Sequence, residues 1–325
     1  MTGRILVVGD ANVDLVLQGD IVPRFGQAEQ TLDRADLVLG GSACIMASGI
    51  AKLGIATSVV GVVGDDEFGA ITRNALVAAD VETSALRVDH TVPTGISVIL
   101  SAPDDRSILT LPGTVPLLSA AEVRDAVELS DPDHVHFASY FLQPVLAREL
   151  PGLLTWLRQR GIRSSLDTNW DPDERWSGLG DVLPLLDYLF PNLHELRAIA
   201  AALGVSGTSG VVNPDDETLA RGLASRGPTV VVKAGADGGW SVTANGAVAR
   251  AAGPAVDAVD TTGAGDSFDA GYLAAVLSGV GDEQTRLAWA ATAGSLSTLG
   301  RGGTVAQPTR AELLAGLLAG LLDRP

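Results

Sequence analysis

The 325-residue chain has one cysteine, Cys44, so it cannot form a disulfide bond within itself. Basic residues are also scarce, because 22 Lys and Arg stand against 39 Asp and Glu and give a formal net charge of -17. Nucleic acids and anionic membranes attract proteins through basic surfaces, so this balance argues against both as partners. Sparse cysteine is typical of a reducing compartment, and we expect a cytoplasmic protein.

Long apolar runs are missing as well. No uninterrupted stretch approaches the roughly 18 apolar residues that suggest a membrane-spanning helix. The four histidines lack the spacing of metal ligands, so we interpret each as structural. The first apolar run, Ile5–Val8, is followed by Gly9-Asp10-Ala11-Asn12, which is not the glycine fingerprint of a nicotinamide-dependent oxidoreductase.

Apolar runs bounded by glycine and aspartate alternate with helical patterns along most of the chain. This rhythm predicts one α/β domain over residues 1–325, with a Rossmann-like three-layer arrangement around a mostly parallel central sheet. Two stretches, at approximately 15–39 and 94–112, read instead as short β-strands without helices. We expect them to pair in a small, discontinuous sheet that stands off the main domain and serves as a lid.

The most informative stretch is Asp260-Thr-Thr-Gly-Ala-Gly-Asp266, which runs into the apolar sequence Ser267–Leu277. Glycines at the start of a buried helix leave backbone N–H groups exposed at its positive end, and this is an anion site. An aspartate beside a bound anion suits the removal of a proton from a neighbouring hydroxyl. The alternative is that Asp266 simply caps the helix.

Two further features lie near the N-terminus. Asn12 and Asp14 follow the first strand, where α/β sheets place ligands, and two residues apart in extended chain they could grip neighbouring hydroxyls. The alternative is a turn held by their side chains. The pair Gly40-Gly41 allows a ligand to approach the backbone, although close packing of a helix on the sheet explains it equally well.

Two features in the second half of the chain suggest a nucleotide site. Asn192 and Glu195 open a helix and could hold a hydrated magnesium ion, which needs few protein ligands, or could form a capping box. Lys233 directly follows a strand and stands beside glycines, so we expect it to touch a phosphate.

Taken in order, these motifs resemble the ribokinase-like (PfkB) carbohydrate kinase family over nearly the whole chain. The Asp260–Asp266 motif is highly specific, whereas Asn12–Asp14 alone is weak. The resemblance implies an ATP-dependent kinase that uses Mg²⁺ and, in some members, K⁺ or another monovalent cation. Paired lids in this family imply a homodimer.

The resemblance also implies a role for each matching residue. Asp266 would be the general base, and the backbone of Gly263, Ala264 and Gly265 the anion hole. The other implied positions fall into four groups: sugar-binding Asn12, Asp14, Gly40, Gly41 and Asn169; magnesium- and phosphate-organising Asn192 and Glu195; nucleotide- or phosphate-side Gly235, Gly238, Thr261 and Thr262, next to the Lys233 inferred above; and Asp260 with Thr262 for the monovalent cation.

The chain departs from the family pattern at two places. Ile45 stands where many members have an asparagine that bonds a sugar hydroxyl, and Asp171 stands where an arginine often follows Asn169. We therefore leave the acceptor open between a sugar, a nucleoside and a keto-sugar acid, for which Arg106 would supply the positive charge. A non-catalytic sugar or nucleotide sensor is the alternative from another class.

Overall fold

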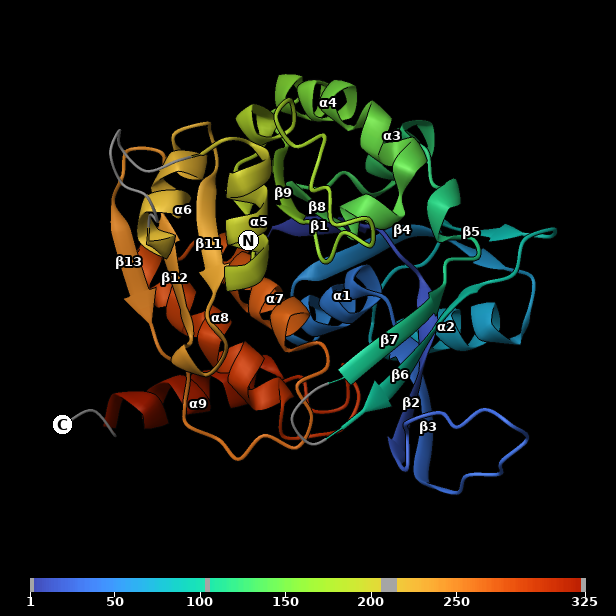
Figure 1. The fold of residues 1–325 in the computed structure, drawn as a ribbon. Coiled ribbons are helices and arrows are strands. Elements are labelled where there is room, and N and C mark those ends of the chain that lie inside the picture. The colour runs from blue at the N-terminus through green and yellow to red at the C-terminus, as the bar shows by residue number, and fades with distance from the viewer. Residues whose placement is uncertain (1–2, 103–105, 206–214, 323–325) are drawn as a thin grey trace.

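The structure is a computed structural model that describes residues 3–102, 106–205 and 215–322 (Figure 1). A nine-stranded sheet forms its centre, in the order β13-β12-β11-β10-β9-β8-β1-β4-β5. The strands from β11 to β5 in this order run parallel, and β12 and β13 continue the sheet as an antiparallel hairpin. The bounds are β1 (Arg4–Val8), β4 (Ala56–Gly64), β5 (Leu86–Asp89), β8 (His134–Ala138), β9 (Arg163–Asp167), β10 (Tyr188–Leu189), β11 (Thr229–Lys233), β12 (Gly239–Val242) and β13 (Val248–Ala251).

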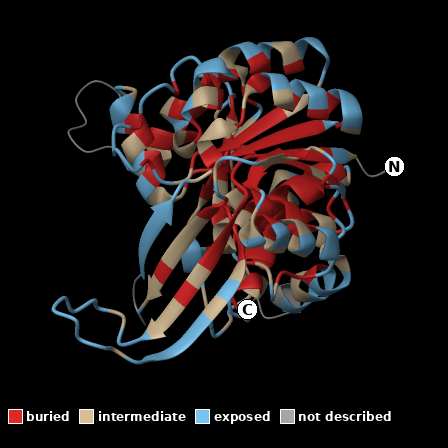
Figure 2. Ribbon diagram, turned by 90° about the vertical axis from the view of Figure 1, so that its right-hand side faces the viewer, coloured by how far each residue is buried: buried red, intermediate tan, exposed pale blue. Residues whose placement is uncertain are grey.

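Helices cover both faces of this sheet because its central strands are apolar on both sides. In β1, Ile5 and Val7 face one layer while Leu6 and Val8 face the other, and all four are buried (Figure 2). The first layer contains α1 (Ser42–Lys52), α2 (Glu67–Ala78), α7 (Ala264–Leu277), α8 (Glu283–Ser297) and α9 (Arg310–Leu322). The second contains α3 (Ala120–Ser130), α4 (Pro144–Gln159), α5 (Leu193–Ala202) and α6 (Asp216–Ala224).

A separate four-stranded sheet, in the order β3-β2-β6-β7, stands off the main body at the lower right of Figure 1. Its strands are β2 (Asn12–Gly19), β3 (Leu32–Gly40), β6 (Gly95–Ser101) and β7 (Arg106–Leu111). All six residues of β7 are exposed, in contrast to the buried strands of the main sheet (Figure 2). The predicted three-layer α/β fold with an additional small sheet is confirmed.

Strand β5 and helix α3 are also present, and no sequence pattern described above predicts either of them. The sequence from Pro214 to Arg226 also predicts a helix, and the structure has α6 there, although Pro214 lies outside the described residues. Across the described ranges, every helix is too short or too polar to cross a membrane.

Candidate active site

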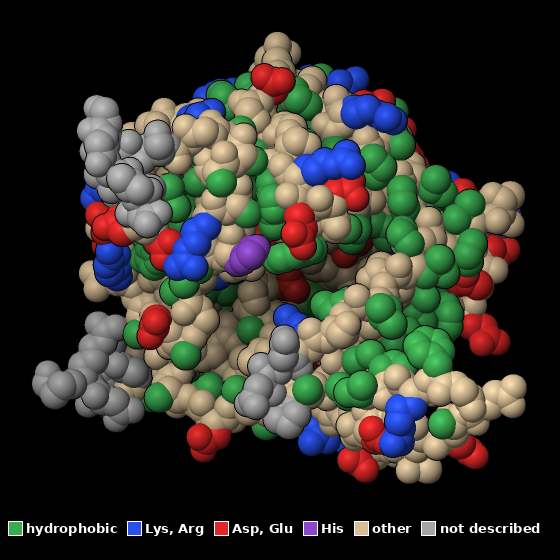
Figure 3. All heavy atoms as spheres, viewed as in Figure 1, with side chains coloured by type: hydrophobic (Ala, Val, Ile, Leu, Met, Phe, Trp, Pro, Cys, Tyr) green, Lys and Arg blue, Asp and Glu red, His purple; other side chains and the backbone are tan. Residues whose placement is uncertain are grey.

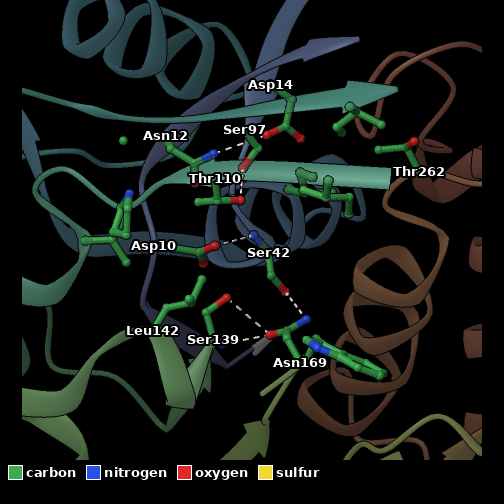
Figure 4. Close-up of a pocket in the computed structure, with 18 of the residues that line it drawn as sticks. Asp10, Asn12, Asp14, Ser42, Ser97, Thr110, Ser139, Leu142, Asn169 and Thr262 are labelled. Atoms are coloured by element: carbon green, nitrogen blue, oxygen red, sulfur yellow. Dashed lines mark hydrogen bonds between the residues drawn. The ribbon is translucent and has the colours of Figure 1, made fainter. Parts of the chain in front are cut away.

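A cavity of about 580 Å³ lies between the small sheet and the carboxyl ends of β1, β8 and β9. We call it the small-sheet cavity. Figure 3 shows a hollow near the centre of the face seen in Figure 1, with acidic side chains beside it. The polar residues that line the cavity are Asp10, Asn12, Asp14, Ser42, Ser97, Arg106, Thr110, Ser139, Asn169, Thr262 and Asp266, most of them labelled in Figure 4.

A second cavity, of about 400 Å³, lies on the other side of the first turn of α7. Its lining includes Phe268 of α7 and Gly294 of α8, and we call it the α7–α8 cavity. Four of the predicted nucleotide- or phosphate-side residues line it, namely Lys233, Gly235, Gly238 and Thr261, together with Ala264 and Gly265 of the predicted anion hole. The sequence motifs from both ends of the chain therefore meet at two neighbouring cavities.

The loop before α7 separates these cavities. Thr261 and Ala264 line the α7–α8 cavity, whereas Thr262, Gly263 and Asp266 line the small-sheet cavity. The loop turns at Gly263, whose φ of 70° is left-handed and readily adopted by glycine. The positive end of α7 thus points at the boundary between the two spaces.

The alternative interpretation of Asp266 as a helix cap is wrong. Gly263 is the N-cap of α7, and Asp266 lies inside the first turn. The first-turn backbone is not wholly free for a ligand, because the N–H of Ala264 donates to the carbonyl of Thr261 at 3.2 Å.

The carboxylate of Asp266 faces the small-sheet cavity and is bonded to another helix. Its Oδ1 accepts a hydrogen bond from the hydroxyl of Ser42, at the start of α1. Burial, together with the negative charge of Asp167, raises the pKa of Asp266 to about 7, although the Ser42 bond opposes the rise. A carboxyl group with this pKa can gain or lose a proton near neutral pH.

Asn12 and Asp14 lie in β2 and both line the small-sheet cavity, so the turn interpretation is wrong. The Nδ2 of Asn12 donates to Oδ1 of Asp14 at 3.1 Å. Burial raises the pKa of Asp14 to about 7, helped by the negative charges of Asp10 and Asp266. Three acids around one cavity repel each other, and this favours a ligand that donates hydrogen bonds.

Gly40 and Gly41 leave room for different neighbouring groups. A Cβ at Gly40 would lie 2.1 Å from Oδ1 of Asp14, so this glycine makes room for that carboxylate. Gly41 lines the cavity and has a φ of 80°, and a Cβ there would lie 2.6 Å from the carbonyl oxygen of Asp10. Gly40 therefore gives room to the small sheet, whereas Gly41, the N-cap of α1, lies against the backbone that follows β1 of the main sheet, as the helix-packing alternative expects.

Asn169 follows β9 and lines the same cavity. Its Nδ2 donates to Oγ of Ser42 at 3.0 Å, and its Oδ1 accepts from the N–H of Ser139 at 2.8 Å (Figure 4). Asp10, at the end of β1, accepts from the N–H groups of Ser42 and Ala43 at 3.1 and 3.0 Å. The start of α1 is therefore fixed by two strand ends.

Arg106 is the basic residue among those that line the small-sheet cavity. Its Nη1 lies 3.5 Å from Oγ1 of Thr262, and its charge opposes the rise in the pKa of Asp14. Asp260 lies behind this contact and accepts from the N–H groups of Thr262 and Gly302, each at 2.9 Å. These bonds tie the loop before α7 to the segment that follows α8.

Lys233 ends β11 and belongs to a buried ionic cluster. Its Nζ contacts the carboxylate of Asp167 and lies 3.5 Å from that of Asp269 on α7, and its side chain is only 11% exposed. Burial alone would lower the pKa of Lys233, but Asp167, Asp269 and Glu195 raise it. Lys233 lines the α7–α8 cavity while its charge is shared with these acids.

Asn192 and Glu195 form a reciprocal capping box at the start of α5. The N–H of Glu195 donates to Asn192 Oδ1, and the N–H of Asn192 donates to Glu195 Oε2, each at 2.9 Å. Burial, with the charge of Asp167, raises the pKa of Glu195 to about 7. The capping box that the sequence allowed is therefore formed. It uses Oε2 of Glu195, so Oε1 can still bind another group.

Among the described residues, no group of three or more His, Cys, Asp and Glu side chains is arranged to hold a metal ion. The histidines fit the structural interpretation: His134 and His136 share the hydroxyl of Ser165, at 2.7 and 2.8 Å. His90 contacts Asp65, and His194 stacks on Trp170.

Gly235 and Gly238 flank a short turn after β11 and have φ of 60° and 82°. A Cβ at Gly238 would lie 2.3 Å from the carbonyl oxygen of Ala251, whereas a Cβ at Gly235 would meet nothing within 4 Å. Gly238 is therefore required by the hairpin, and Gly235 leaves open space beside the α7–α8 cavity.

Sequence reasoning did not single out six polar or aromatic residues that line the small-sheet cavity: Asp10, Ser42, Ser97, Thr110, Ser139 and Trp170. A signal exists for two of them, because Asp10 directly follows a buried strand and Ser42 directly follows the double glycine. Ser139 directly follows β8, and Trp170 lies three residues after the end of β9.

A family model and known proteins are similar to this chain over nearly its whole length. A model described as pfkB family carbohydrate kinase matches residues 2–310. The chain is 29% identical over 323 residues to an ATP-dependent ribose-1-phosphate kinase of Halopiger xanaduensis, covering 98% of this chain and 99% of the relative. It is 30% identical over 334 residues to a fructokinase of Klebsiella pneumoniae, covering 98% and 100%.

Solved structures share the fold. The structure of Arabidopsis thaliana ribokinase complexed with ribose and ATP superposes with a TM-score of 0.78 at 23% identity, covering 98% of this chain and 99% of that one. A fructokinase with bound ATP from Xylella fastidiosa gives a TM-score of 0.82 at 22% identity, covering 99% and 100%.

Proposed function

The chain belongs to the pfkB family of carbohydrate kinases, and we propose that it transfers the γ-phosphate of ATP to a hydroxyl group of a sugar or sugar-like small molecule. One observation carries the proposal. The start of α7 divides two cavities, with Asp266 facing one and Gly265 facing the other. Donor and acceptor would meet across this boundary.

On the acceptor side, we assign Asp266 as the general base. Its carboxylate faces the small-sheet cavity, and its pKa of about 7 lets it accept a proton at neutral pH. Asn12, Asp14, Gly41 and Asn169 would hold the remaining hydroxyls, because their polar groups line the same space. Gly40 would contribute by making room for Asp14.

On the donor side, the α7–α8 cavity would receive the nucleotide. Gly235 and Gly238 border it, Thr261 and Lys233 lie at its edge, and Thr262 faces the opposite cavity. The N–H groups of Gly263, Ala264 and Gly265, at the positive end of α7, would stabilise charge on the phosphoryl group as it moves. For Ala264 this requires its bond to Thr261 to open.

The residues present fit a divalent cation. Glu195 and Asp167 place negative charge around Lys233. Burial and the charge of Asp167 raise the pKa of Glu195 although Lys233 opposes the rise, so a cation beside Glu195 would stabilise its ionised form. Mg²⁺ held through Asn192 and Glu195 would supply that charge and neutralise the phosphates.

A monovalent cation such as K⁺ would be held by Asp260 and Thr262. Both oxygens of Asp260 already accept an N–H group, but a carboxylate has further lone pairs for a cation. Activity measured in potassium against tetramethylammonium salts checks this assignment.

The small sheet would act as a lid that excludes water from the acceptor. Its strands expose Leu32, Leu37 and Leu109, an apolar surface that a second copy would cover in a homodimer through the lid. We place the enzyme in the cytoplasm.

A second candidate acceptor is a sugar that carries an anionic group. Arg106 lies in the small-sheet cavity, and a related protein is named a ribose-1-phosphate kinase. A cation in a cavity with three acids suits a phosphate or carboxylate on the acceptor. Nucleosides also stay open, and Ile45 would not bond a hydroxyl of any of these acceptors.

The test is an acceptor panel that measures ADP formation from ATP. It contains ribose, fructose, ribose-1-phosphate, a keto-sugar acid and nucleosides. Turnover with at least one acceptor is the expected result, and the anionic members should lose turnover selectively in Arg106→Gln. Ligand binding with no turnover on any acceptor would favour a non-catalytic sensor instead.

A further inference from the structure

Ser42 connects three parts of the chain that are far apart in sequence. It is the first residue of α1, and its N–H is held by Asp10 at the end of β1. Its hydroxyl lies between Asn169, after β9, and Asp266, in the first turn of α7. The side chain that contacts the proposed base is thus fixed from two directions.

The direction of the hydrogen bonds follows from one backbone group. The N–H of Ser139 can only donate, so the atom of Asn169 that it meets at 2.8 Å must be the amide oxygen. The amide nitrogen of Asn169 then faces Ser42 and donates to Oγ at 3.0 Å. The hydroxyl proton of Ser42 is therefore left to point at Oδ1 of Asp266.

We propose that Ser42 is a positioning residue for phosphoryl transfer, which binds Oδ1 of Asp266 and leaves Oδ2 to take the proton of the acceptor. The inference rests on the proposed kinase function. Asn169 orients the hydroxyl of Ser42 by donating a hydrogen bond to its Oγ (Figure 4). Asp10 fixes the start of α1, because its carboxylate accepts hydrogen bonds from the N–H groups of Ser42 and Ala43.

The arrangement has a consequence that packing alone would not produce. A donated hydrogen bond stabilises the ionised carboxylate, which is the form that can act as a base. The Ser42 bond therefore opposes the burial that raises the pKa of Asp266. Without it, a larger fraction of Asp266 is protonated at neutral pH, and the enzyme needs a higher pH to work.

The experiment compares Ser42→Ala with wild-type enzyme across pH. Hydrogen bonds to charged groups are strong enough to move a pKa by about one unit, so the acidic limb of kcat/KM should move up by about one pH unit. Activity should fall roughly tenfold at pH 6 and return to within about twofold at pH 9. Ser42→Thr keeps the hydroxyl, so the acidic limb of its kcat/KM profile should stay at the wild-type pH.

Ser48→Ala is the matched control. Ser48 is buried on the same helix but donates to the carbonyl of Cys44, so its loss should leave the limb unmoved. The inference is overturned if kcat/KM of Ser42→Ala falls by the same factor at every pH, or if it does not fall at all.

A second readout separates this inference from the kinase assignment. Carbon NMR of labelled aspartate, with the Asp266 signal assigned from Asp266→Asn, reports the pKa of Asp266 in the ligand-free protein. An upward shift in Ser42→Ala supports the proposed bond, and no shift overturns it even if the enzyme is active. Absence of turnover by the wild-type protein on every acceptor overturns the kinase function, and the role of Ser42 with it.

Discussion

Replacing Gly40 by alanine adds a single methyl group at a point where the structure has no room for it. The new Cβ would lie 2.1 Å from Oδ1 and 2.4 Å from Cγ of Asp14, and 2.9 Å from Nδ2 of Asn12. Carbon and oxygen atoms in contact need more than 3 Å. The carboxylate of Asp14 must therefore move by about 1 Å, and its 3.1 Å bond from Asn12 is strained or broken.

Two effects of different size follow. Overpacking a buried site destabilises a protein by about 1–3 kcal/mol, so Gly40→Ala should still fold. A displacement of about 1 Å in a group that positions substrate can lower activity up to 10²-fold, so we expect kcat/KM for the acceptor to fall roughly 10- to 100-fold. The KM for ATP should change less than about twofold, because Gly40 lies on the acceptor side of α7.

Steady-state kinetics with acceptor and ATP varied in turn, together with thermal unfolding, measure both effects. Gly152→Ala is the control, since a Cβ there meets nothing within 4 Å and the residue lies in a helix, where alanine is the better residue. A folded Gly40→Ala enzyme with unchanged acceptor kinetics would refute the placement of Asp14 in the acceptor site.

The remaining predictions concern buried charges. Lys233→Met should destabilise the fold by about 3–5 kcal/mol in urea unfolding, because Asp167 and Asp269 lose the cation beside them, and an unchanged unfolding midpoint would contradict the proposed cluster. Asp14→Asn should stabilise the ligand-free protein at pH 8 and have little effect at pH 4. The pKa of Asp14 is raised from 3.8 to about 7 in the folded state, so the folded chain binds the proton more tightly, and stability is lost as pH rises through this interval. Melting temperatures of both proteins from pH 4 to 8 check this, and a constant difference would count against a desolvated Asp14.

Much of the fold follows from local patterns. Some of the parallel strands are apolar runs bounded by glycine: β1 at Arg4–Val8 is followed by Gly9, and β4 at Ala56–Gly64 ends in glycine. Two elements were harder to predict. Strand β5 has only four residues, of which Leu86 and Val88 are apolar, and it lies at the edge of the sheet, while α3 begins with a capping box at Ser119 and Glu122.

Site residues could be predicted from the sequence where they are close neighbours within one motif. The loop before α7 is such a case, because glycine, helix start and aspartate are neighbours in sequence. Contacts between distant segments were not readable: Ser42 and Asp266 are 224 positions apart, and no spacing rule joins them. The local pattern also left open a wrong alternative, the helix cap at Asp266, because the sequence alone does not show that Gly263 has that position.

The pairing of Lys233 shows the same limit. Its place after a strand and beside glycines predicts a phosphate contact, and it does line the α7–α8 cavity. Its buried partners Asp167 and Asp269 come from β9 and α7, and only the folded chain brings them together. The sequence could show the chemistry of each residue but not which charge compensates which.

The proton acceptor at the start of α7 is the centre of this account, and kcat of the Asp266→Asn variant tests it most directly. Asparagine keeps the size of the side chain but cannot take the proton, so kcat should fall roughly 10²- to 10⁴-fold while both KM values change little. A folded variant that keeps most of the wild-type kcat would contradict the assignment of Asp266 as the base.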